Sequence, residues 1–156
     1  MPALEATVAA GFSRRYVELA GKVRELAEPL SDEQFWRKPY PYGNSFGHLV
    51  LHLTGNLSYY IGAGIGGTGY VRDRDREFTE TRRLPKQEVM RLFDVAVEVV
   101  QQTIAAQAAG DWSLSYSALR EEDAADRFGI FLRCVTHLHS HIGQMIFLSY
   151  ELQHQG

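Results

Sequence analysis

The residues most able to do chemistry in this sequence are two pairs of histidines, each pair spaced four residues apart. One pair is His48 and His52, and the other is His137 and His141. Residues four apart on an α-helix lie on one face, one turn above the other, so the two imidazoles of a pair can reach a single ion. Neutral imidazole binds zinc, nickel, copper and iron well. The pattern predicts a metal site in which His137 and His141 are two of the ligands.

A helical pair supplies only two ligands, and a third has to come from another helix. His52 and His48 are both candidates, and spacing alone does not choose between them. If both bind, four histidines close the coordination sphere, whereas three leave a position open for water or substrate. His139 lies two positions from His137 and from His141, so it should point away from their shared face.

Two more residues near the second pair are candidates for the same site. Cys134 lies one turn before His137, where a small buried hydrophobe is the better interpretation and a thiolate ligand or nucleophile is the alternative. Gln144 lies one turn after His141 and could orient a ligand histidine or a bound water. No Asp or Glu lies within the motif 137–141, so the His-Glu-x-x-His pattern of metalloproteases is absent.

A glycine-rich run, Gly62–Gly69, follows the helix that should carry His52. It resembles a phosphate-binding loop only in composition, because it lacks the Gly-Lys-Ser/Thr ending, and we interpret it as a connector. Alternating charges follow at 72–77 and are typical of a solvated surface. The alternative is that an arginine such as Arg74 folds over a pocket mouth to hold an anionic substrate, which would make this segment a mobile lid.

The elements that must position these residues are four long helices. Apolar residues recurring at steps of three and four predict helices over about 4–30, 46–60, 85–109 and 124–153. Ser31 and Gln34 have the form of a capping box, and Asn44 or Ser45 should cap the second long helix. Irregular connectors between four long helices favour an all-α fold, an antiparallel four-helix bundle forming one domain over 1–156.

Composition narrows the class of protein further. The chain has 156 residues, 45% of them hydrophobic and 22% charged, with a net charge of −3. Nothing forms a basic surface for nucleic acid, and no apolar run is long enough to span a membrane. The first residues lack the features of a secretory signal, and the single cysteine fits a reducing compartment. We therefore expect a cytoplasmic protein that binds neither nucleic acid nor membrane.

Two sequence motifs resemble a known superfamily. Ser45-Phe46-Gly47 with Leu51-His52-Leu53, and His137-x3-His141-x-Gly143-Gln144 near the end of the chain, are similar to the DinB-like superfamily of four-helix bundles. This group includes thiol-dependent S-transferases. The stretch His52-Leu53-x-Gly55-Asn56, followed by Arg72-x-Arg74-Asp75-x-Glu77-Phe78, resembles a bacterial subfamily without an assigned function.

The resemblance implies a site and an activity. Carried over by position, the metal ligands are His52, His137 and His141, with His48 left out. The implied function is a metal-dependent enzyme holding zinc or nickel, with iron as a further option, and acting with a low-molecular-weight thiol as an S-transferase. The alternatives are a hydrolase of a small substrate and a non-catalytic, metal-stabilised or ligand-binding bundle. Relatives commonly form homodimers, and many have arginine where this chain has Ile142.

Overall fold

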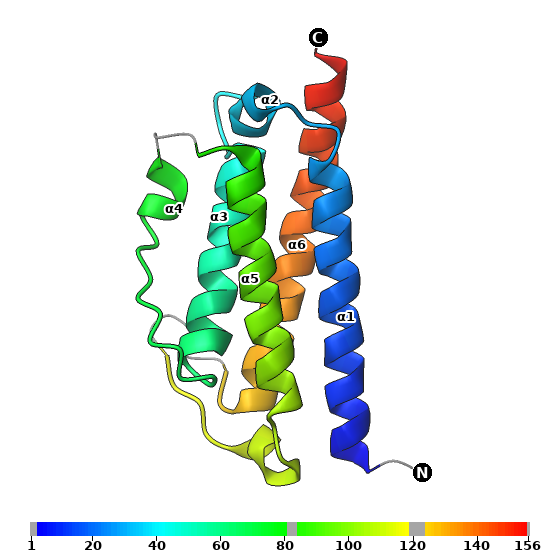
Figure 1. Ribbon diagram of the computed structural model, residues 1–156, viewed down its shortest axis with the longest axis vertical. Helices are drawn as coiled ribbons and strands as arrows, with labels where there is room; N and C mark the ends of the chain where they lie inside the picture. Colours follow the sequence, from blue (N-terminus) through cyan, green and yellow to red (C-terminus); the bar gives the residue numbers. More distant parts are fainter. Residues whose placement is uncertain (1–2, 81–83, 119–123, 156) are drawn as a thin grey trace.

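The computed structural model describes residues 3–80, 84–118 and 124–155. Its frame is four long helices: α1 (Leu4–Ala27), α3 (Phe46–Leu57), α5 (Lys86–Ala105) and α6 (Arg127–His154). Figure 1 shows these helices packed lengthwise, and the described residues contain no β-strand. The predicted all-α bundle is confirmed.

The long helices do not simply alternate in direction. α1 and α6 run one way and α3 and α5 run the other, as the colours of Figure 1 show. Each long helix packs against two neighbours, in the order α1, α5, α3, α6 around the bundle. Because α3 and α5 are parallel, the chain between them has to return along the length of the bundle. We call residues 64–80 the crossover segment; it contains the short helix α4 (Arg76–Thr79).

Shorter elements cover the two ends of the bundle. Helix α2 (Asp32–Trp36) begins with the predicted capping box, in which the Gln34 amide N–H donates to Ser31 Oγ at 3.1 Å. The π-helix η1 (Ser58–Ala63) continues α3, and the 3₁₀-helix η2 (Ala109–Ser113) follows α5. Each of these elements adds a buried aromatic side chain to the core: Phe35 from α2, Tyr60 from η1 and Trp112 from η2.

Helix boundaries depart from the predicted ones for local reasons. α1 ends at Ala27, two residues before Pro29, whose missing N–H cannot continue the helical ladder. α6 begins at Arg127 because the Asp126 side chain caps it, accepting a 2.7 Å hydrogen bond from the Gly129 amide. The predicted start near residue 124 overlooked this cap.

The core runs the length of the bundle and is rich in aromatic side chains. Tyr16 is fully buried, and its hydroxyl donates to the Phe131 carbonyl at 2.7 Å, which ties α1 to α6. Phe46 of α3 and Phe93 of α5 are also fully buried. No helix among the described residues is long and apolar enough to cross a membrane. The candidate site lies on the seam between α3 and α6.

Candidate metal centre

Three histidines converge on the seam between α3 and α6. His52 comes from α3, and His137 and His141 come from consecutive turns of α6. The Nε2 atom of His137 lies 3.1 Å from Nε2 of His52 and 3.1 Å from Nε2 of His141. One ligand nitrogen from each ring falls within 4.8 Å of the other two. This cluster could hold a metal ion.

Hydrogen bonds at the far side of two rings orient their Nε2 atoms toward one another. Nδ1 of His52 lies 2.8 Å from Glu77 Oε2, and Nδ1 of His141 lies 2.9 Å from Gln144 Oε1. Both oxygens can only accept here, so each Nδ1 carries a proton, and the neutral tautomer with that proton presents a lone pair at Nε2. Nδ1 of His137 is buried and has no hydrogen-bond partner among the described residues.

The donor set suits a divalent cation. In a tetrahedral zinc site with Zn–N bonds of about 2.0–2.1 Å, neighbouring nitrogens lie about 3.3–3.4 Å apart, close to the separations in this cluster. Without a cation, the lone pairs of His52 and His141 both face the single Nε2 of His137. That crowding of acceptors within one buried cluster fits a metal site better than a hydrogen-bonded core.

The same environment keeps the two imidazoles of α6 neutral. Burial, reinforced by His141 and His52, lowers the pKa of His137 to about 3. Burial also lowers the pKa of His141, and the Gln144 hydrogen bond only partly offsets this. Both rings are therefore uncharged at neutral pH, which is the state that a metal ligand requires.

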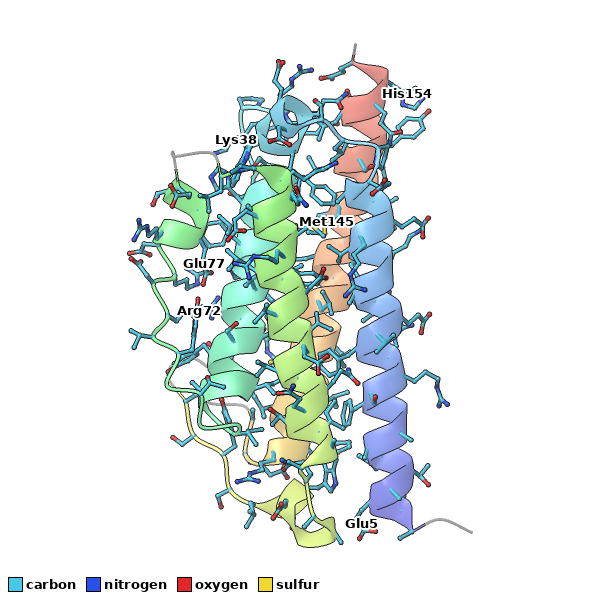
Figure 2. All side chains as sticks on the ribbon, viewed as in Figure 1. Glu5, Lys38, Arg72, Glu77, Met145 and His154 are labelled. Carbon is cyan, nitrogen blue, oxygen red and sulfur yellow. The ribbon has the colours of Figure 1, made fainter. Side chains whose placement is uncertain are left out.

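A buried ion pair supports His52 from outside its own helix. Arg72 donates from Nε to Glu77 Oε1 at 2.7 Å and from Nη2 to Oε2 at 2.9 Å, so the pair is bidentate. Both side chains are more than nine-tenths buried. Figure 2 shows them on the side of the bundle where the crossover segment runs. The expectation of a purely solvated surface over 72–77 is corrected at these two residues, because their charges neutralise each other inside.

A glycine on α3 makes room for that carboxylate. A Cβ atom placed on Gly55 would lie 2.0 Å from Glu77 Oε1 and 2.8 Å from its Cδ. No side chain larger than hydrogen fits there while Glu77 holds His52. Glu77 and Gly55 were not among the candidate residues from the sequence; their only signal was their place in the motifs that carry the family resemblance.

His48 belongs to a separate set of contacts. Its Nε2–H donates to the Glu80 carbonyl at 3.0 Å, and its Nδ1 accepts from Ser45 Oγ at 2.7 Å. Ser45 also caps α3, accepting from the His48 amide. The structure thus brings His52, and not His48, together with the α6 pair, while His48 ties the start of α3 to the crossover segment.

The other candidate residues lie at varying distances from the cluster. Gln144 contacts His141 directly. Cys134 is 1% exposed in the core and is not part of the three-histidine group. Arg74 is exposed, with its guanidinium 5.4 Å from the centre of the Phe78 ring, beside a surface hollow of about 530 Å³. His139 is exposed on another face of α6, as its helical phase predicts.

Fold and site together define a helical bundle with a partly buried three-histidine cluster that could hold a metal. A family model described as "Protein of unknown function (DUF1572)" matches residues 12–156. The chain belongs to this family, and the sequence-based expectation of a family without an assigned function agrees with it. No curated protein matches the sequence.

Proposed function

We propose that this chain is a DinB-like metal-dependent enzyme whose three ligands are His52, His137 and His141. The observation that carries the proposal is the convergence of three imidazole Nε2 atoms. Within the described part of the chain, no fourth histidine, cysteine or carboxylate joins them. Three protein ligands leave a coordination position for a small molecule, as in catalytic zinc sites. Zinc and nickel are the metals we favour, with iron third.

Exposure favours a catalytic role over a purely structural one. His137 and His141 are only half-buried, whereas His52 is 5% exposed. The α6 side of the cluster is therefore reachable from solvent. A closed, metal-stabilised bundle would need a fourth ligand and no access. The non-catalytic alternative predicts stabilisation by metal without any turnover.

Thiol-dependent S-transfer is the reaction we favour, and hydrolysis of a small substrate is second. A divalent ion in such a site lowers the pKa of a thiol or water bound to it. Hydrolysis commonly also uses a carboxylate general base, but Glu77 lies on the Nδ1 side of His52, away from the converging Nε2 atoms, and is held by Arg72. Attack by a thiolate on an electrophile needs no such base.

The first experiment measures metal content. Protein purified without chelators should contain one equivalent of metal, and His52→Ala and His137→Ala should each lose most of it. His48→Ala is the matched control, because it removes a histidine of α3 from outside the cluster. Stoichiometric metal in both cluster variants would disprove the site.

The second experiment separates the reactions. Metal-loaded protein is assayed with a low-molecular-weight thiol plus an electrophile, and separately with small esters and amides. Consumption of thiol that depends on metal and on His137 supports the transferase, whereas metal-dependent ester cleavage supports the hydrolase. Neither activity, together with a chelator-induced fall in Tm, supports the non-catalytic bundle.

We also propose that the chain forms a homodimer through α6. Large apolar side chains are exposed along this helix: Phe147 is 77% exposed and Tyr150 63%, and Leu132 and Ile146 are each 45% exposed. Apolar surface gathered on one helix is typical of a contact with another chain. Sedimentation of the purified protein tests this directly.

A further inference from the structure

The crossover segment is anchored to the bundle next to the candidate metal ligand of α3. Between Gly69 and Arg76, every residue except Arg72 is exposed. Arg72 and then Glu77 turn inward and pair beside His52. Figure 2 labels both side chains on the side of the bundle where the crossover segment runs. Because both partners belong to the crossover segment, the pair joins this stretch to the bundle through its contacts with His52 of α3.

His52 differs from the other two cluster histidines in what holds it. His141 is oriented by Gln144 of its own helix, and Nδ1 of His137 has no partner in the described structure. His52 is contacted by Glu77 at 2.8 Å and by Arg72 Nη2 at 3.4 Å, and its ring centre lies 4.8 Å from that of Phe78. All three contacts come from the crossover segment.

The charges of the pair suit a neighbouring cation. The Glu77 carboxylate lies nearer to the His52 ring than the Arg72 guanidinium does, at 2.8 Å against 3.4 Å. A carboxylate that accepts from the far nitrogen of a ligand histidine fixes its orientation and makes it a stronger ligand. Arg72 keeps that carboxylate buried, because an unpaired charge there would be strongly unfavourable.

We propose that Glu77 is a positioning residue for His52, and that a bound metal ion in turn holds the crossover segment against the bundle. The proposal rests on the proposed metal centre. Coupling between two binding events is reciprocal, so a carboxylate that strengthens metal binding when docked is itself docked more firmly when metal is present. The segment from Tyr70 to Phe78 is then held most firmly against the bundle when the metal is bound.

The test compares Glu77→Gln with Asp75→Asn, a matched loss of one negative charge at an exposed position of the same segment. Chelator-treated proteins are titrated with Co²⁺, whose visible spectrum reports the ligand field, and hydrogen exchange is followed over residues 70–78. In wild type, Co²⁺ should slow exchange across this segment. Glu77→Gln should bind Co²⁺ about 10- to 100-fold more weakly, with shifted bands and no metal-dependent slowing, whereas Asp75→Asn should match wild type.

A second variant guards against misfolding. If Glu77→Gln alone leaves Arg72 unpaired and unfolds the apo protein, the double variant Arg72→Gln/Glu77→Gln removes both charges and should show the same loss. This proposal alone would be overturned if the folded Glu77→Gln variant kept the Co²⁺ affinity and spectrum of wild type. It would also be overturned if Co²⁺ did not change hydrogen exchange over residues 70–78 in wild type. Failure of wild type to bind Co²⁺ would overturn the metal centre as well.

Discussion

Replacing Gly55 by alanine should weaken the candidate metal centre without touching any ligand. The added Cβ would lie 2.0 Å from Glu77 Oε1, and ordinary contact begins at 3.4 Å. The carboxylate must therefore withdraw from α3. The helix around Gly55 is fixed by packing on both sides, so the side chain of Glu77 is the part that moves. Its 2.8 Å hydrogen bond to His52 is then lost.

Two opposing effects determine how much Gly55→Ala changes the free energy of unfolding. Alanine in a helix interior is favoured over glycine by about 0.5–1 kcal/mol. Against this, a hydrogen bond to a charged group contributes about 1.5–3 kcal/mol. The lost contact with His52 outweighs the gain, so we expect Gly55→Ala to lower the free energy of unfolding by about 1–2 kcal/mol. Metal affinity should fall about 10- to 100-fold, as for the loss of other groups that support a ligand.

Gly21→Ala is the matched control, because it makes the same substitution inside α1 where a new Cβ meets nothing within 4 Å. It should stabilise the protein by about 0.5–1 kcal/mol and leave metal affinity unchanged. Affinity is measured by competition with a chelator, and stability by denaturant unfolding of the apo protein. Stabilisation of Gly55→Ala to the same extent as Gly21→Ala, with wild-type affinity, would refute the steric reasoning.

Four further outcomes are expected. Phe93→Ala should lower the free energy of denaturant unfolding by about 3–5 kcal/mol, because Phe93 is fully buried. Tyr16→Phe should cost only about 0.5–1.5 kcal/mol in the same assay, since one hydrogen bond is lost. Burial lowers the pKa of His48 from 6.5. As the pH falls below 6.5, the unfolded chain therefore binds a proton at His48 before the folded chain does, and the free energy of unfolding decreases. In the apo protein with His48→Gln, the free energy of unfolding should decrease less steeply over the same pH range. Phe147→Glu should shift the sedimentation of a dimer to that of a monomer, with the helical circular dichroism retained.

The helices and the α6 histidine pair could be predicted because their signals are local. His137 and His141 are four residues apart, and one turn of helix dictates that they share a face. The position of His139 on another face follows from the same geometry. The cap of α3 could be narrowed to Asn44 or Ser45, because it depends on residues within one turn, and Ser45 is the residue that caps the helix.

Glu77 could not be predicted from spacing, because its role depends on where the crossover segment travels. It lies 25 residues from His52 in the chain, and alternating charges at 72–77 are usually solvated. Burial of Arg72 and Glu77 becomes visible only when α3 and α5 are seen to be parallel, so that the connector returns past His52. The choice of His52 over His48 depends likewise on the register between α3 and α6.

The up-down-down-up order of the helices also bears on how the protein is made. His52 and His137 are 85 residues apart in sequence, and both α6 ligands belong to the last of the four long helices to leave the ribosome. Until α6 emerges, α1 has no partner for Tyr16 and the cluster has only one of its histidines. Because domains fold as units during synthesis, α6 should complete the bundle core and the candidate metal centre in one step. Metal taken up by the nascent chain before that point would meet only one of the three cluster imidazoles, that of His52.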